Sequence, residues 1–253
     1  YLKGEAFTLS GEFLCRGELD WPDLFLEPAK EKVLRRAVDL INDQGEHMMS
    51  RGLLEAGPPG TGKTMFGRVA MRQADTTFIW VSARDLARAG AFGGLAYLFE
   101  IAAECAPTIA FVEDIDNWLD GYTIDLLKTE MDGIKQRKGI LTVMTSNFPE
   151  LLPAALIDRP GRFHDVVEMA LPTEAVRLRM LTAWLPESGD ATRAKIAKDT
   201  HGLSGAHLRE LTVFARTLDA EEKVGIDSAL ALALAKMQEQ RELIASLRQA
   251  PDY

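Results

Sequence analysis

Short apolar runs alternate with helical patterns along the first two thirds of the chain. Five of these runs have the length and composition of buried strands, and they cover residues 52–56, 77–81, 108–112, 140–145 and 166–170. Apolar residues at helical spacing predict helices over 27–42, 65–71, 95–105 and 122–131, and a further helix opens at 82–86. Strands that are apolar on both faces and alternate with helices predict an α/β fold, a parallel sheet flanked by helices.

Two stretches fall outside this alternation and suggest the domain organisation. Residues 1–20 alternate apolar and polar positions, which fits a β-hairpin or an extended arm. From Thr173 onward the pattern is wholly helical. We therefore expect an N-terminal arm or hairpin over 1–20, an α/β domain over 21–172 and a small all-α domain over 173–253.

The loop after the first core strand fits a phosphate-binding pattern. Gly57-Pro58-Pro59-Gly60-Thr61-Gly62-Lys63-Thr64 matches G-x-x-x-x-G-K-[ST], the P-loop, in a strand–loop–helix context. Its three glycines lack a Cβ, so backbone N–H groups can turn against phosphate oxygens at a helix N-terminus. Lys63 is then expected at the β- and γ-phosphates of ATP, and the Thr64 hydroxyl at Mg²⁺. An accidental Gly-Pro turn is disfavoured because every fixed position is filled.

Polar residues follow the later strands at the edge where open α/β sheets bind ligands. Glu113-Asp114 comes directly after 108–112, and carboxylates there suit Mg²⁺ and the orientation of a water molecule. Asn147 follows the strand at 140–145 and can place its side-chain amide near a γ-phosphate. Arg159 and Arg162 come later, where two arginines in a turn, taken alone, usually form a solvated surface.

In this order the motifs resemble those of the AAA+ ATPases, and more narrowly their classical AAA clade, over about residues 21–245. Gly57 to Thr64 resembles the Walker A motif, residues 109–116 resemble Walker B, and Thr145-Ser146-Asn147 resembles sensor 1. Glu130-Met131-Asp132-Gly133 is similar to the segment ahead of the family's fourth core strand. Arg159-Pro160-Gly161-Arg162-Phe163 is similar to the arginine-finger segment, and Gly202 to Leu208 to the sensor 2 segment of a helical lid.

The resemblance implies a homo-oligomeric ring, most commonly a hexamer, that hydrolyses ATP to remodel, unfold or thread a protein client. Arg159 and Arg162 would reach the γ-phosphate of a neighbouring subunit, and Gly205 and Ala206 would contact the adenine. Trp184 stands where many members have a histidine beside the base, so it either stacks on the adenine or packs in the helical core. Alternative functions are a nucleic-acid motor or loader of the same superfamily, and a nucleotide-dependent scaffold with weak hydrolysis.

The sequence departs from the family pattern at three places. The usual Asp-Glu order of Walker B is reversed to Glu113-Asp114, so Glu113 takes the Mg²⁺ role and the shorter Asp114 polarises the attacking water. The span from Asp116 to Leu126 is shorter than in most members. Residues 88–94 are expected to form a Gly-rich central-pore loop, in which Phe92 either replaces the family's aromatic residue or packs under its own loop.

The composition restricts the possible binding partners more than it restricts the possible folds. The 253 residues are 47% hydrophobic and 26% charged, as is ordinary for a globular protein, and the net charge of −9 argues against broad nucleic-acid binding. No apolar run approaches the ~18 residues of a membrane span, and no signal-peptide pattern opens the sequence. Cys15 and Cys105 are too few for a disulfide framework or a metal site, so we expect a cytoplasmic location.

Overall fold

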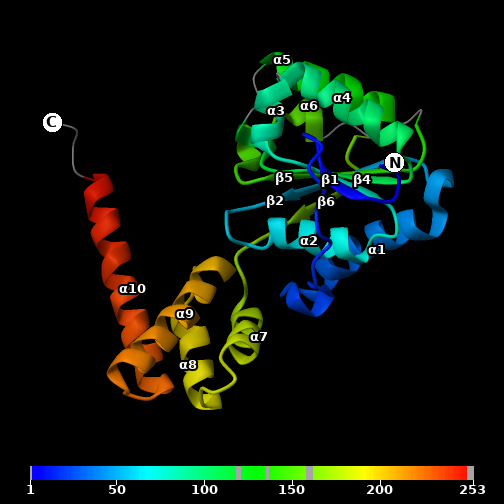
Figure 1. The fold of residues 1–253 in the computed structure, drawn as a ribbon. Coiled ribbons are helices and arrows are strands. Elements are labelled where there is room, and N and C mark those ends of the chain that lie inside the picture. The colour runs from blue at the N-terminus through cyan, green and yellow to red at the C-terminus, as the bar shows by residue number, and fades with distance from the viewer. Residues whose placement is uncertain (1, 90, 118–120, 135–136, 158–161, 250–253) are drawn as a thin grey trace. The chain divides into compact units, whose positions relative to one another are not determined.

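The chain forms two compact units, Tyr1–Ala170 and Leu171–Tyr253. The computed structural model describes residues 2–89, 91–117, 121–134, 137–157 and 162–249. Figure 1 shows that the first unit is a sheet between two layers of helices, and that the second unit is built from helices. Each unit is described here by itself.

The first unit is organised around a six-stranded sheet in which all neighbouring strands run parallel. The spatial order is β1-β3-β4-β5-β2-β6. The strands are β1 (Ala6–Thr8), β2 (Arg51–Ala56), β3 (Thr77–Val81), β4 (Thr108–Val112), β5 (Ile140–Ser146) and β6 (Asp165–Glu168). The four inner strands are almost wholly buried, as their continuous apolar runs predict. The predicted α/β fold class is confirmed.

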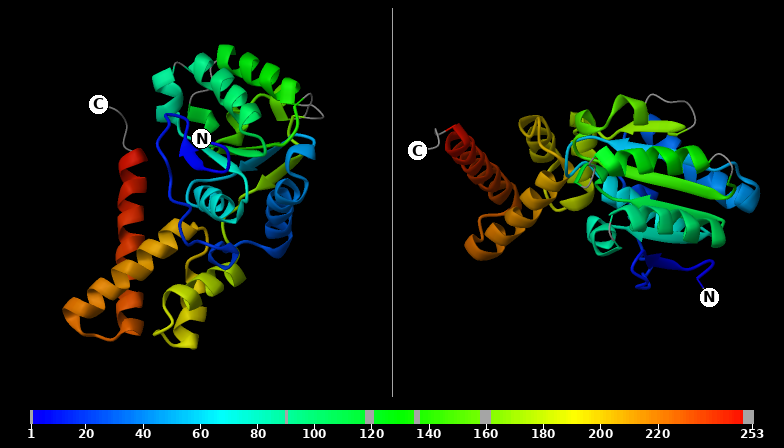
Figure 2. Two further views of the ribbon diagram at one scale, coloured as in Figure 1. Left: turned by 45° about the vertical axis from the view of Figure 1, so that its right-hand side comes forward. Right: turned by 90° about the horizontal axis from the view of Figure 1, so that it is seen from above.

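Helices cover both faces of this sheet and enclose a hydrophobic core on each side (Figures 1 and 2). On one face lie α1 (Pro28–Gln44) and α2 (Lys63–Gln73), whose Leu34 and Phe66 belong to a core with Phe78 and Phe111. On the other lie α3 (Ala83–Ala89), α4 (Ala91–Glu104), α5 (Gly121–Ile134) and α6 (Ala154–Ile157). These helices share the second core with β2, β4 and β5. Helices on both faces of the sheet therefore support the carboxyl ends of β2, β4 and β5.

The helix α4 begins earlier than the sequence predicts. A Gly-rich loop over 88–94 is wrong for most of this stretch, because α3 continues to Ala89 and α4 starts at Ala91. Leu95, Leu98 and Phe99 are fully buried, and burying this face outweighs the ~1 kcal/mol that each interior glycine costs a helix. Phe92 therefore lies in the first turn of α4, and its side chain is outside what the structure describes. Its contact with a client stays a prediction.

The N-terminal residues are part of the first unit. β1 pairs with β3 at the edge of the sheet, and the chain then turns so that Phe7 makes an antiparallel bridge with Phe13. Beyond this turn the Arg16 guanidinium donates hydrogen bonds to four carbonyl oxygens, those of Gly4 (3.0 Å), Met71 (2.6 Å), Ala74 (2.7 Å) and Thr76 (2.7 Å). Arg16 thus ties the N-terminal segment to the C-terminal end of α2.

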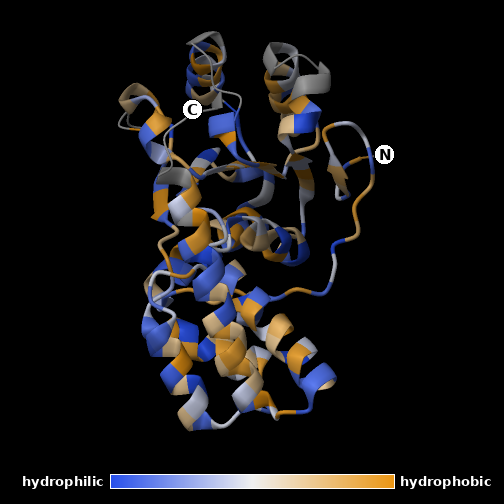
Figure 3. Ribbon diagram, turned by 90° about the vertical axis from the view of Figure 1, so that its left-hand side faces the viewer, coloured by the Kyte–Doolittle hydropathy of each residue, from blue (hydrophilic) through white to orange (hydrophobic). Residues whose placement is uncertain are grey.

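The second unit contains α7 (Glu174–Trp184), α8 (Asp190–Asp199), α9 (Gly205–Glu222) and α10 (Ile226–Gln249). Hydrophobic and hydrophilic residues alternate along these helices (Figure 3), and buried leucines such as Leu181, Leu211 and Leu230 form the core. Ser204 caps α9 through a reciprocal pair of contacts with His207. Within the described ranges, no helix is both long and apolar enough to cross a membrane.

Candidate nucleotide site

The P-loop connects β2 to α2, in the strand–loop–helix context that the motif requires. Gly62 is the N-cap of α2 and has a φ of 110°, a conformation that residues with a Cβ rarely adopt. Glycine is needed at position 57 because the backbone of Met169 lies close to it. A Cβ at this position would lie 2.3 Å from the carbonyl oxygen of Met169. The loop therefore brings its backbone to the N-terminus of α2, where unpaired N–H groups can meet an anion.

Lys63 opens α2 with its ammonium group folded back onto the loop. Its Nζ donates to the carbonyl oxygens of Gly57 at 2.6 Å and Pro58 at 2.9 Å. Burial lowers the pKa of Lys63, and the nearby charges of Asp114, Glu55 and Asp116 oppose this. The ammonium is thus held inside the loop that a phosphate would enter, with carbonyl acceptors that phosphate oxygens could replace.

Glu55 is a fully buried acid in the strand that leads into the P-loop. Neither of its carboxylate oxygens has a hydrogen-bond partner within the described part of the chain. Burial raises the pKa of Glu55 well above its ordinary value, and the charge of Lys63 opposes that rise. Sequence reasoning missed this residue, although an acid inside an apolar strand was a visible signal.

Glu113, the first acid of the predicted pair, is anchored through both carboxylate oxygens. Its Oε1 accepts a hydrogen bond from the Thr64 hydroxyl at 2.8 Å, and its Oε2 accepts one from the Trp80 indole N–H at 2.9 Å. The Glu113 backbone N–H continues the sheet ladder by donating to the Val81 carbonyl at 2.9 Å. The two residues predicted to hold Mg²⁺ therefore lie in direct contact.

Asp114, the second acid, pairs with the predicted sensor residue. The Asn147 amide donates to Asp114 Oδ1 at 2.8 Å, while the Asn147 backbone N–H donates to Asp116 Oδ1 at 2.9 Å. Asp114 has a φ of 48°, a left-handed conformation that costs a non-glycine residue roughly 1–3 kcal/mol. Its own N–H donates to the Thr145 hydroxyl at 2.9 Å, which holds this conformation. Asp116 and Thr145 lie within the motifs that resemble Walker B and sensor 1, and these contacts give them a supporting role that the sequence did not predict.

The donor chemistry at this edge fits Mg²⁺. A hydroxyl and a carboxylate supply oxygen atoms, and Mg²⁺ is usually held by one or two protein groups together with water and phosphate. Among the described residues, there is no group of three or more histidines, cysteines or acids that could hold a metal ion.

Of the two predicted finger arginines, the structure describes only Arg162. Arg159 lies outside the described residues. Arg162 is only 2% exposed, and its guanidinium binds both carboxylate oxygens of Asp132, at 3.2 and 3.1 Å, and the carbonyl of Ala155. Within one chain the Arg162 side chain is therefore directed inward, and contact with a neighbouring subunit stays a prediction.

The segment after Arg162 lies directly against β2. The His164 N–H donates to the Gly52 carbonyl at 2.8 Å, and the Gly52 N–H donates to His164 Nδ1 at 3.2 Å. A Cβ on Gly52 would come within 2.2 Å of the Arg162 carbonyl oxygen. Only glycine at position 52 leaves space for this contact.

The predicted adenine contacts all lie in the second unit. Trp184 ends α7 and is half-buried, with the Arg209 guanidinium 5.2 Å from its ring centroid. Gly205 and Ala206 form the first turn of α9, directly after the Ser204 cap. Their approach to a nucleotide stays a prediction, as does the choice between base stacking and packing for Trp184.

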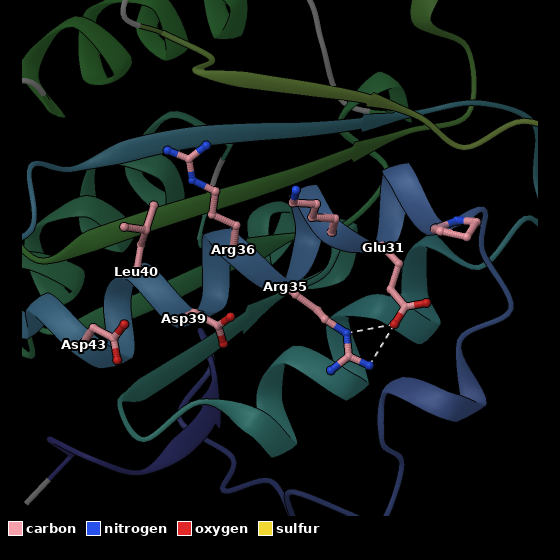
Figure 4. Close-up of a pocket in the computed structure, with 8 residues that line it drawn as sticks. Glu31, Arg35, Arg36, Asp39, Leu40 and Asp43 are labelled. Carbon is pink, nitrogen blue, oxygen red and sulfur yellow. Dashed lines mark hydrogen bonds and ion pairs between the residues drawn. The ribbon is translucent and has the colours of Figure 1, made fainter.

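A separate pocket lies along α1 and is lined by residues of that helix (Figure 4): Pro28, Glu31, Lys32, Arg35, Arg36, Asp39, Leu40 and Asp43. Arg35 pairs with Glu31 at 2.8 Å and lies 4.6 Å from the centroid of the Trp21 ring. Figure 4 shows the labelled side chains spread along the helix, without a common point to which they are directed.

Known proteins are similar to this chain in sequence and in fold. Residues 53–171 match the family described as "ATPase family associated with various cellular activities (AAA)". The chain is 30% identical over 245 residues to the ATP-dependent zinc metalloprotease FtsH 4 of Sphaerobacter thermophilus, which covers 85% of this chain and 37% of that protein. It is 35% identical over 180 residues to FtsH of Trieres chinensis, covering 64% and 28% of the two chains. The crystal structure of the FIGL-1 AAA domain in complex with ADP superposes with a TM-score of 0.68 and 26% identity, covering 86% and 84%.

The fold and the family match are those of a P-loop nucleotide-binding protein. Residues 53–171 belong to the AAA family, and the predicted resemblance to the AAA ATPases is confirmed. The chain spans about a third of the length of the curated relatives it matches.

Proposed function

We propose that the chain is the Mg²⁺-dependent, ATP-hydrolysing module of a ring ATPase. The observation that carries this is the pair of contacts at the sheet edge, Thr64 with Glu113 and Asn147 with Asp114. They join the P-loop, both acids and the sensor residue in one site. Family membership supports the same activity.

Each of these residues has a distinct role in the proposed reaction. Lys63 would exchange the loop carbonyls for the β- and γ-phosphate oxygens. Thr64 and Glu113 would hold Mg²⁺, which when bound neutralises charge on those oxygens. Asp114, oriented by Asn147, would take a proton from the attacking water as its oxygen bonds to the γ-phosphorus. The bond from that phosphorus to the bridging oxygen breaks, giving ADP and phosphate.

Two variants separate binding from hydrolysis. Lys63→Ala should abolish most ATP affinity, because a positioned ammonium is lost. Asp114→Asn should keep ATP bound but lower the turnover number by about 100-fold or more, the usual contribution of a general base. Asp125→Asn is the matched control, since Asp125 is an exposed acid on α5 paired with Lys128 at 2.9 Å. Wild-type turnover by Asp114→Asn would contradict the role of Asp114, and binding without turnover in the wild type would favour the scaffold alternative.

We further propose that Arg159 and Arg162 act across a subunit boundary in a hexameric ring. An arginine stabilises charge on the transferred phosphoryl group, so each site would be completed by its neighbour. For Arg162 this requires the pair with Asp132 to open. Mixing Arg162→Ala subunits with Lys63→Ala subunits should restore part of the activity. No recovery, in rings shown to contain both subunits, would count against action in trans.

The proposed client is a protein, which the names of the FtsH relatives and the net charge of −9 both favour over nucleic acid. Phe92 at the start of α4 is the proposed contact residue, and Trp184, Gly205 and Ala206 are the proposed adenine contacts. Phosphate release should rise with unfolded protein and not with DNA. The reverse result would favour the nucleic-acid motor.

A further inference from the structure

Trp80 is the residue before the last one of β3, near the carboxyl ends of the strands, where the proposed site is formed. It pairs in register with Phe111 of β4, and Glu113 follows two residues later on the same side of the strand. The indole ring lies 4.7 Å from the Phe111 ring and 6.0 Å from the Phe78 ring, measured between centroids. These apolar contacts fix the plane of the indole, and therefore the direction in which its N–H points.

The indole N–H is directed at the carboxylate of Glu113. It donates to Oε2 at 2.9 Å, while the other oxygen, Oε1, accepts from the Thr64 hydroxyl at 2.8 Å. A glutamate side chain has three rotatable bonds, and ordering them costs conformational entropy. The hydrogen bond to Oε2 leaves Glu113 one favoured arrangement, with Oε1 facing Thr64.

We propose that Trp80 is a positioning residue for the Mg²⁺ site and acts through Glu113. This inference rests on the proposed function, because it assigns a purpose to the contact between Glu113 and Thr64. The reversed acid order gives it a reason. Glutamate is one methylene longer than the aspartate usual at this position of the family, so it needs an additional anchor to present its oxygen at the same place. The Trp80 indole provides that anchor from the neighbouring strand.

The test compares Trp80→Phe with Trp21→Phe. Phenylalanine keeps an aromatic ring against Phe111 but has no N–H, and Trp21 is a buried tryptophan of the same core that contacts Phe66. The measurement is ADP binding by calorimetry over a series of Mg²⁺ concentrations. Trp80→Phe should raise the half-saturating Mg²⁺ concentration about tenfold, the effect of losing one hydrogen bond to a charged group. ADP affinity without Mg²⁺ should not change, and Trp21→Phe should behave as wild type.

A double-mutant cycle with Glu113→Ala identifies the partner. This variant removes the carboxylate that both the Trp80 indole and the Thr64 hydroxyl contact, so Glu113→Ala should also raise the Mg²⁺ requirement. Adding Trp80→Phe to it should have no further effect. Additive effects would show that Trp80 supports the fold generally and would overturn the proposal. If Trp80→Phe fails to fold, as judged by circular dichroism, Trp80→Leu, which also lacks the N–H, takes its place, and an unchanged Mg²⁺ requirement in that variant would overturn the proposal.

The outcomes also separate this inference from the proposed function. A wild-type chain that binds ADP without any Mg²⁺ dependence would overturn both. Mg²⁺-dependent binding that is identical in wild type and Trp80→Phe would overturn the role of Trp80 alone.

Discussion

Replacing Arg16 by methionine removes a charged group that satisfies the C-terminal end of α2. Its guanidinium donates to the carbonyls of Met71, Ala74 and Thr76, and to that of Gly4. The last carbonyls of a helix have no partner within it, and a cation there also interacts favourably with the helix dipole. Arg16 therefore stabilises the helix whose first residue is Lys63.

The magnitude follows from the number and exposure of these bonds. A hydrogen bond from a charged group contributes roughly 1.5–3 kcal/mol when buried. Because Arg16 is half-buried, solvent screening reduces this, and we expect about 2–3 kcal/mol for all four bonds together. At about 2–4 °C per kcal/mol for a unit of this size, the melting temperature of the first unit should fall by about 4–12 °C.

The assay is urea unfolding followed by tryptophan fluorescence, supported by calorimetry. Trp21 and Trp80 both report on the first unit. Arg68→Met is the matched control, because Arg68 is an exposed residue in the middle of the same helix. Arg16→Lys should be intermediate, since one ammonium cannot reach four carbonyls. Equal stability of Arg16→Met and Arg68→Met would refute this account of Arg16.

Two further predictions concern buried positions. Glu55→Gln should become more stable relative to the wild type as pH rises above 4.5. The reason is that folded Glu55, with its raised pKa, keeps a proton that the unfolded chain releases. Urea unfolding at several pH values checks this, and a stability difference that is independent of pH would contradict it. Gly67→Ala should cost about 1–2 kcal/mol, because the new Cβ would lie 2.5 Å from Phe111 Cζ and overpacking outweighs the better helix propensity of alanine; unchanged or higher stability in urea would show that the Phe111 ring moves aside.

The parts of the fold that sequence predicts well are those set by local pattern. The inner strands are continuous apolar runs between turn signals, and β3 and β4 match their predicted bounds. The P-loop is recognisable because each fixed position has a steric or chemical reason. The glycines at 93 and 94 are different, since local propensity favours a loop while the buried face of α4 favours a helix.

The contacts that sequence does not predict join residues far apart in the chain. Trp80 and Glu113 are 33 positions apart, and Arg162 and Asp132 are 30 apart. Neither pair has a spacing signal, because their proximity depends on the order of strands in the sheet. The sequence also does not show which polar groups are buried. It shows Glu55 only as an acid in an apolar run, and its lack of hydrogen-bond partners among the described residues is known only from the structure.

The contact between Gly52 and residues 162–164 has a mechanical consequence. Gly52 lies in β2, the P-loop begins directly after the last residue of that strand, and His164 is hydrogen-bonded to Gly52. A displacement of β2 would therefore also displace residues 162–164. In the proposed ring, nucleotide binding that moves β2 would then move these residues too, and a bulky residue at position 52 would disrupt this connection.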